Sequence, residues 1–232
     1  MTFVRQVVDT TGAAPVSGDV DGDGVTDIGW FNAGQWAFRT ANGEVLRAAF
    51  GQAGDEPVVG DFNDDGRDDI GVFRGGSWLV RFSVSGGPVQ MSFSYGREGD
   101  LPLAGRWAGS TRDGVAVVRG KQWFVRATPT SGVAHSSFTW GRDGDVPVVG
   151  AWLGDGVDRP GLVRGKDWFL GTSIQRPRTV WSFAVGRPTD LPLAGDWDGD
   201  GVHTGGLVRD TTFFRLLDHE GRVAPTTVEF RG

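Results

Sequence analysis

The sequence has no cysteine, one tyrosine and two methionines among its 232 residues. Without cysteine the chain has no disulfide framework and no thiol chemistry, which neither requires nor excludes an oxidising compartment. No apolar run approaches the length of a membrane-spanning helix, and Met1–Val8 lacks the pattern of a signal peptide. We therefore expect no membrane insertion, and we expect any export signal to lie outside this sequence.

The formal net charge is −6, with 29 acidic and 23 basic residues. The acidic residues concentrate in a few Asp-rich segments, so nucleic acid is not an expected partner. The 39 glycines and 10 tryptophans indicate short strands and tight turns. A chain of this length can bury a core as one large all-β domain or as two small ones.

A unit of 42 to 45 residues occurs five times along the chain. Each copy has a proline, a glycine three residues later and an aromatic residue 21 residues later. The prolines are Pro15, Pro57, Pro102, Pro147 and Pro192, the glycines are Gly18, Gly60, Gly105, Gly150 and Gly195, and the aromatic residues are Trp36, Trp78, Trp123, Trp168 and Phe213.

Each unit predicts four strands: an apolar segment such as PVVG, a second short apolar segment, an aromatic segment such as SWLVRF, and an alternating segment such as MSFSYG. A four-stranded unit of this length is typical of a β-propeller, whereas a solenoid has shorter repeats and a sandwich does not repeat so strictly. We therefore predict an all-β fold, a five-bladed β-propeller of four-stranded antiparallel blades.

The repeat predicts one domain over residues 1–232, with repeat cores at about 9–51, 52–96, 97–141, 142–186 and 187–231. The end segments FVRQVV (3–8) and TTVEFR (226–231) both match the fourth-strand position. We expect the ring to be closed by terminal strand pairing, in which one of them completes a blade begun at the other end of the chain. The other is then an extra strand, and residues 1–8 are extra or closing.

Asp-rich loops follow the first strand of units one, two and five, with the sequences DVDGDGVTD, DFNDDGRDD and DWDGDGVHT. Oxygen-bearing side chains stand at positions 1, 3 and 5, and a glycine at position 6 allows the bend that lets alternate residues point inward. This spacing suits Ca²⁺, with a backbone carbonyl at position 7 and an Asp at position 9 completing the shell. The expected ligands are Asp19, Asp21, Asp23, Val25, Asp27, Asp61, Asn63, Asp65, Arg67, Asp69, Asp196, Asp198, Asp200 and Val202.

The motif begins like an EF-hand loop, but position 12 is Trp30, Val72 or Leu207 instead of a bidentate Glu, and no helical pattern follows. We expect calcium between strands in units one and two, and a less complete site in unit five, where Thr204 replaces the last Asp. An Asp- and Gly-rich turn without metal is the alternative.

Units three and four have lost the pattern. The loop Arg106–Gly114 has no acidic residue at the ligand positions, and the loop Ala151–Arg159 keeps only Asp155. We expect both loops to be metal-free, with Arg106 or Arg159 placing a guanidinium where the metal would lie. A metal that only some units keep is expected to be structural.

The repeated aromatic residues can serve either as sugar-stacking platforms or as packing between blades, and their recurrence in step with the core pattern favours packing. Trp181 escapes the repeat and is the aromatic residue that most merits a test as a ligand contact. The aromatic residues that follow loop position 1 are Phe62, Trp107, Trp152 and Trp197, and the other less regular ones are Trp30, Tyr95 and Trp140.

Acidic and basic residues also recur at fixed positions. An Asp two residues before four of the prolines and an Arg 17 residues after them predict a repeated ion pair that joins successive blades, with a repeated ligand pocket as the alternative. The two series are Asp55, Asp100, Asp145 and Asp190, and Arg74, Arg119, Arg164 and Arg209.

The segment FGQAGDEPVVGDFNDDGRDDIGVFRGGSWLVR resembles the FG-GAP/VCBS repeat of bacterial extracellular proteins, which is related to the calcium-loop blades of integrin α-subunit propellers. The blade count and repeat length resemble those of tachylectin-type lectin propellers. The resemblance extends from about Val8 to Arg231. It implies calcium in the Asp loops and a role in adhesion, carbohydrate binding or assembly.

Catalysis is not expected, because His135, His203 and His219 show no metal or triad spacing and the carboxylate clusters lie in the calcium-type loops. We predict a calcium-stabilised binding module of an extracellular or cell-surface protein, a monomer or part of a larger chain, that recognises a glycan or a cell-surface protein. A spacer or protein-interaction propeller without a small ligand is the alternative, and a glycoside-active enzyme comes last.

Overall fold

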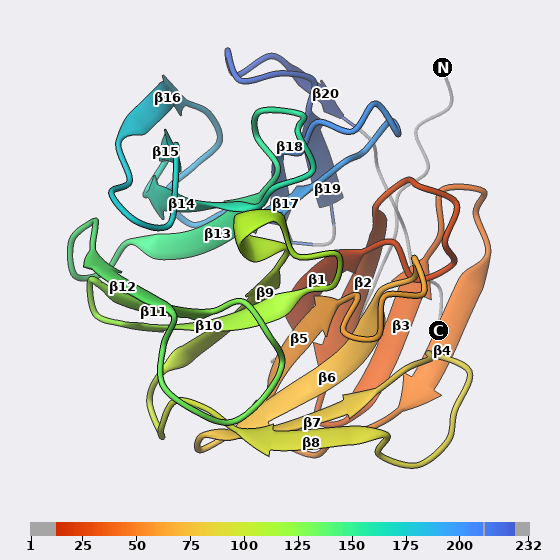
Figure 1. Ribbon diagram of the computed structural model, residues 1–232. Helices are drawn as coiled ribbons and strands as arrows, with labels where there is room; N and C mark the ends of the chain where they lie inside the picture. Colours follow the sequence, from red (N-terminus) through yellow and green to blue (C-terminus); the bar gives the residue numbers. More distant parts are fainter. Residues whose placement is uncertain (1–12, 211, 226–232) are drawn as a thin grey trace.

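The computed structural model describes residues 13–210 and 212–225, which form twenty β-strands in five four-stranded antiparallel sheets. The sheets surround a central axis as the blades of a propeller (Figure 1). The predicted five-bladed all-β fold is therefore confirmed. Among the described residues, the one helical element is the 3-10 turn η1 (Trp107–Gly109), and no helix is long and apolar enough to cross a membrane.

Each blade consists of four strands that are consecutive in the chain, and the first strand lies beside the axis. Blades one and two contain β1 (Ala14–Gly18), β2 (Asp27–Asn32), β3 (Gln35–Arg39), β4 (Val45–Ala49), β5 (Glu56–Gly60), β6 (Asp69–Arg74), β7 (Ser77–Arg81) and β8 (Met91–Ser94). Blades three to five contain β9 (Leu101–Gly105), β10 (Gly114–Arg119), β11 (Gln122–Arg126), β12 (Ser136–Thr139), β13 (Val146–Gly150), β14 (Arg159–Arg164), β15 (Asp167–Gly171), β16 (Thr179–Ala184), β17 (Leu191–Gly195), β18 (Thr204–Arg209), β19 (Thr212–Leu216) and β20 (Val223–Pro225).

Burial is greatest in the second strand of each blade and decreases toward the rim. The first five of six residues in β2, β6, β10, β14 and β18 are all buried, because these strands are covered on both faces by neighbouring blades. In β4, β8 and β12, half-buried residues alternate with exposed ones. That period of two is expected for a strand with one face on a neighbour and the other in solvent.

The strand-three aromatic residues pack between blades, as predicted. Trp78 belongs to a core cluster that includes Val117 of blade three, and Trp168 to one that includes Leu207 of blade five. None of the five is more than 4 % exposed. The aromatic residues after loop position 1 are buried as well, so both series form core and not an exposed platform.

Four Asp–Arg pairs fasten the connections between blades. Arg74 donates from Nε and Nη2 to the Asp55 carboxylate at 2.6 and 2.8 Å, and Asp55 also accepts the amide hydrogen of Gln52. Each Asp precedes the first strand of a blade and each Arg ends its second strand, so the pair fixes how the chain enters the blade. The predicted pairing is therefore confirmed, and it recurs as Arg119–Asp100, Arg164–Asp145 and Arg209–Asp190. Both partners belong to the same repeat, so the pairs tie each blade to its own entry segment and do not join strands of successive blades as predicted.

The ring closes where blade five meets blade one. The amide of Thr26 donates to the Asp196 carbonyl at 2.7 Å, and the Ser17 hydroxyl donates to the Ala194 carbonyl at 2.9 Å. Strand β20 pairs with β19, so blade five takes its described fourth strand from the C-terminal side of the chain. The end segments 3–8 and 226–231, which were predicted as fourth strands, lie outside the described residues.

Candidate functional site

The Asp loops join the first strand of a blade to the second and open at one end of the central channel. The carboxylate at position 1 fixes the shape of the loop. Asp19 accepts amide hydrogens from Gly22 and Asp23 on Oδ1, at 2.7 and 3.1 Å, and from Gly24 on Oδ2, at 2.9 Å. Gly24 has φ of 85°, in the left-handed region that favours glycine. Asp61 and Asp196 hold their loops in the same way.

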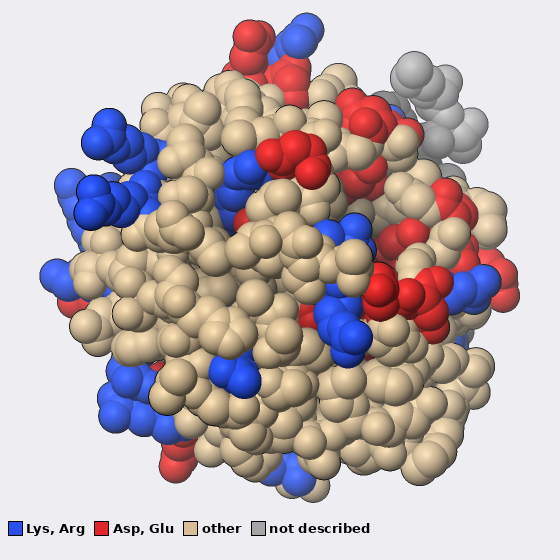
Figure 2. Space-filling model, viewed as in Figure 1, with Lys and Arg blue, Asp and Glu red and all other residues tan. Residues whose placement is uncertain are grey.

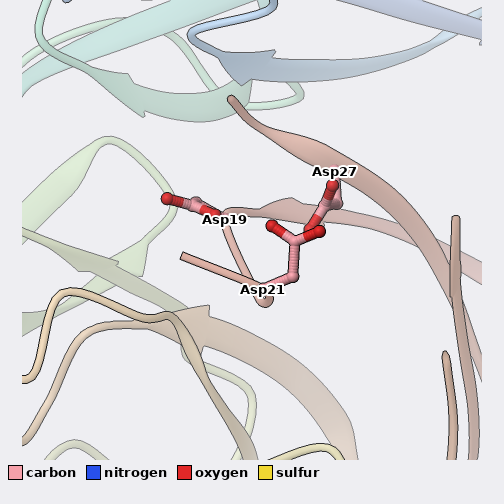
Figure 3. A group of neighbouring side chains, drawn as sticks. All are labelled: Asp19, Asp21 and Asp27. Atoms are coloured by element: carbon pink, nitrogen blue, oxygen red, sulfur yellow. The ribbon is translucent and has the colours of Figure 1, made fainter. Parts of the chain in front are cut away.

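In blade one, Asp19, Asp21 and Asp27 each offer a carboxylate oxygen, and these oxygens lie within 4.8 Å of one another. Figure 3 shows the carboxylate of Asp21 beside that of Asp27, with Asp19 next to them. Asp27 is buried and accepts the amide hydrogens of Val20 and Ala41. Burial, together with the nearby charge of Asp21, raises the pKa of Asp27 to about 7. A bound cation would offset the repulsion between the carboxylates of Asp21 and Asp27.

In blade two the expected ligands are Asp61, Asn63, Asp65 and Asp69, and the Asn63 amide donates to Asp65 Oδ2 at 2.9 Å. Asp69 is fully buried, and its Oδ2 accepts the amide hydrogen of Phe62 while its Oδ1 is buried without a hydrogen-bond partner. Burial raises the pKa of Asp69 to about 8. A buried carboxylate oxygen without a partner is costly, and a hard cation is a suitable partner for it.

Blade five keeps three of the predicted ligands. Asp196, Asp198 and Asp200 present oxygens within 4.8 Å of one another. At position 9, the Thr204 hydroxyl donates to the carbonyl of Leu216 at 2.8 Å, so its hydrogen bond points to β19 and no carboxylate closes the loop. A metal in this loop would therefore lack the position-9 carboxylate that blades one and two have.

The residues at position 7 are held by the carboxylate at position 5. The amides of Val25, Arg67 and Val202 donate to the Oδ1 atoms of Asp23, Asp65 and Asp200 at 2.8 to 3.0 Å.

In blade four, an arginine occupies the space between the ligand positions. Arg159, at position 9, donates to both Asp155 oxygens at position 5 (2.7 and 2.6 Å) and to the Val157 carbonyl at position 7 (2.6 Å). The guanidinium lowers the pKa of Asp155 to about 2. It therefore contacts the groups at positions 5 and 7 that would bind a metal, as predicted for this residue.

Blade three differs in backbone as well as in sequence. Its loop contains η1, and Ala108 has a positive φ of 55°. The Arg106 guanidinium lies 3.9 Å from Asp61, the first residue of the loop in blade two. The Arg106 guanidinium thus approaches a neighbouring loop, whereas the prediction placed it at the metal position of its own.

A ring of polar residues at loop position 8 was missed by the sequence reasoning. Each of these residues joins its blade to position 1 of the preceding loop. Asp68 accepts the amide hydrogen of Asp19 at 2.7 Å and donates its own amide to the Asp19 carbonyl at 2.7 Å. The ring consists of Thr26, Asp68, Asp113, Asp158 and His203. Its residues recur with the spacing of the prolines, but their types change from unit to unit and so conceal the series.

The ring lines the mouth of a channel of about 270 Å³ between the first strands. Enclosure raises the pKa of Asp68 to about 7, and enclosure together with the charges of Asp158 and Asp68 raises the pKa of Asp113. His203 Nδ1 lies 4.0 Å from Asp158 Oδ1. Figure 2 shows that acidic side chains gather at the right and top of this face, whereas Lys and Arg lie along the left edge and also near the centre.

Trp181 packs against another residue that departs from the repeat. The ring of His219 lies 4.5 Å from that of Trp181 and 6.4 Å from that of Trp152, with one ring nitrogen 3.0 Å from the His203 carbonyl. Trp181 is thus partly buried against the core of blades four and five, which agrees with packing rather than with an exposed platform.

No protein-family model matches the chain, and no curated protein matches it. Among solved structures, the chain is similar to a lectin of Agrocybe aegerita described as specifically recognising non-reducing terminal N-acetylglucosamine. The TM-score is 0.52 at 14 % identity, over 94 % of this chain and 81 % of that one. The likeness shows a shared fold. This chain is a five-bladed β-propeller with a lectin propeller among its structural neighbours, and its resemblance to FG-GAP/VCBS repeats stays a prediction.

Proposed function

We propose that this protein is a calcium-stabilised binding module that recognises glycans outside the cell. The propeller fold that it shares with a lectin supports the binding role. Departures from the repeat are confined to particular blades, so the chain has room for a ligand site on an otherwise uniform scaffold.

The strongest support for calcium binding is the position of Arg159 in the loop of blade four. In blade four a permanent cation contacts the carboxylate at position 5 and the carbonyl at position 7. Blades one and two have an acidic residue instead of an arginine at position 9, and their carboxylates have raised pKa values. Calcium would supply to those loops the positive charge that Arg159 supplies to blade four.

The expected residues fit calcium well in blades one and two. Oxygen is the only ligand element that they offer, as a hard cation requires, and the hydrogen bonds of Asp19 and Asp61 hold both loops in shape. When bound, calcium would neutralise the carboxylates and stabilise the native state.

A glycan array probed with the fluorescently labelled protein in calcium tests the binding role. We expect saturable binding to a defined group of glycans that the free sugar competes away. A protein that stays folded in calcium but binds no glycan would contradict the proposal and favour the spacer or protein-interaction alternative. Turnover of an arrayed glycoside would instead indicate an enzyme.

A further inference from the structure

Blade five contains a pocket of about 200 Å³ beside its Asp loop. We call it the blade-five pocket. It lies between the loop that precedes β18 and the end of β19 with the turn that follows. The residues that matter for the argument are Trp197, Asp200, Thr204, Arg215, Asp218 and His219.

Arg215 is the first of two departures from the repeat that face this pocket. It lies two residues after the strand-three aromatic residue. The other four blades have an apolar residue at that position, and each of these is 0 % exposed: Phe38, Val80, Val125 and Leu170. Blade five thus has a guanidinium where its sister blades have core.

Thr204 is the second departure. The equivalent residues of blades one and two are Asp27 and Asp69, which are buried carboxylates that tie the loop to the rest of the blade. Thr204 is shorter, and its hydroxyl is engaged with the Leu216 carbonyl. In blade five, Arg215 thus replaces an apolar residue and Thr204 replaces a carboxylate, and both line the polar blade-five pocket.

The walls of this hollow are fixed in place. Arg215 donates from Nη1 to the Trp197 carbonyl at 3.0 Å, while its Nε is buried and has no hydrogen-bond partner. Asp200 uses Oδ1 to hold the amide of Val202, which leaves Oδ2 for a ligand. His219 is held by the His203 carbonyl and by Trp181. Fixed polar groups of both kinds reduce the entropic cost of binding a polar ligand.

We infer that the blade-five pocket binds one ring of a neutral sugar, an inference that rests on the proposed glycan recognition. A volume of about 200 Å³ equals roughly seven waters at about 30 Å³ each, which suits one sugar ring and not a chain. Arg215 can donate to ring hydroxyls and Asp200 can accept from them, while Trp197 offers apolar contact. Asp218 is paired with Arg222, so the carboxylates of Asp198, Asp200 and Asp218 exceed the guanidiniums of Arg215 and Arg222 by one charge when the loop holds no metal, and acidic sugars are then disfavoured.

Two substitutions restore the residue that the sister blades carry, and both should fold. Arg215→Leu reinstates the apolar residue of blade four, and Thr204→Asp reinstates the carboxylate of blades one and two. Asp210→Asn, at an exposed turn of the same blade, is the matched control. The probes are the monosaccharides N-acetylglucosamine, galactose and glucose and the acidic sugar N-acetylneuraminic acid, titrated into full-length protein in calcium.

Binding is followed by the indole N–H signals of the tryptophans in heteronuclear NMR spectra, and folding by thermal melts. We expect a neutral monosaccharide to shift the Trp197 signal, and each restoring substitution to weaken binding at least tenfold while Asp210→Asn leaves it unchanged. Undiminished binding by folded Arg215→Leu and Thr204→Asp proteins would overturn the inference, as would a preference for the acidic sugar. If the glycan array is positive but either of these outcomes is found, the proposed glycan recognition is kept and only the assignment of the blade-five pocket is rejected. If the array shows no binding at all, the proposed glycan recognition is rejected as well.

Discussion

Two carboxylates at the same loop position should respond differently to calcium. Asp65 in blade two and Asp155 in blade four both stand at position 5, but Asp155 already has Arg159 as its cation. We therefore expect Asp65→Ala to destabilise the protein mainly in calcium, and Asp155→Ala to destabilise it equally in calcium and in chelator.

The expected magnitudes follow from ligand linkage. Free calcium at one hundred times the dissociation constant stabilises the native state by about 2.7 kcal/mol per site. If Asp65→Ala weakens the site about a hundredfold, only about 0.4 kcal/mol of that remains. The loss of about 2.3 kcal/mol corresponds to a fall in Tm of roughly 5–9 °C for a domain of this size. The Asp155 side chain is 49 % exposed, so loss of its ion pair should cost about 1 kcal/mol or less.

Thermal melts of the wild type and both variants, each in calcium and in chelator, check this expectation. In chelator, Asp65→Ala loses only local hydrogen bonds to Arg67 and Asn63, so its Tm should lie close to that of the wild type. Equal Tm differences for Asp65→Ala in the two buffers would refute the reasoning, because its carboxylate would then have no metal to bind.

Three further predictions concern pH, the channel mouth and the Asp–Arg pairs. In chelator, Asp27 and Asp69 have pKa values of about 7 and 8, above the value of an Asp in the unfolded chain. Between these values the native state keeps protons that the unfolded chain has released. The free energy of unfolding should therefore fall as pH rises from about 4 to 8. Calcium binds the ionised form, so its affinity for the blade-one site, measured by titration calorimetry, should drop about tenfold from pH 8 to pH 6, and a pH-independent affinity would contradict this. Asp113→Asn removes a buried carboxylate that lies near the charges of Asp158 and Asp68, and its amide oxygen can still accept the Asp61 N–H. It should therefore raise Tm in chelator at pH 8. A lowered Tm would show that the carboxylate has a stabilising partner. Asp100→Ala leaves Arg119 and the Arg97 amide without their acceptor and should lower the free energy of unfolding in urea by about 2 kcal/mol, whereas exposed Asp143→Ala should change it by less than about 0.5 kcal/mol.

The fold could be predicted from the sequence because its evidence is periodic. A proline, a glycine and an aromatic residue at fixed offsets mark every blade, and the buried strand-three residues follow directly from that spacing. The Asp loops could be located because their pattern is local, with all ligands within nine consecutive residues. The contacts of the Arg159 guanidinium could also be predicted, because the residues at positions 5, 7 and 9 of such a loop lie close together.

Contacts between distant parts of the chain could not be predicted in the same way. The position-8 ring depends on which residue of one blade faces position 1 of its neighbour, and the sequence does not contain that geometry. Arg106 was expected in its own loop, yet its guanidinium approaches Asp61 of the adjacent blade. The blade-five pocket needs two departures, Thr204 and Arg215, which lie on adjacent strands, and only the structure shows that both line one pocket.

Direct measurement of bound calcium tests the central claim most simply. Metal-stripped protein is titrated with calcium by isothermal calorimetry, and Asp21→Ala and Asn63→Ala are titrated in parallel, since they remove position 3 in blades one and two. We expect at least two sites in the wild type and the loss of one site in each variant. A wild-type protein that is folded but binds no calcium would contradict it, and the Asp loops would then be ordinary turns on a propeller.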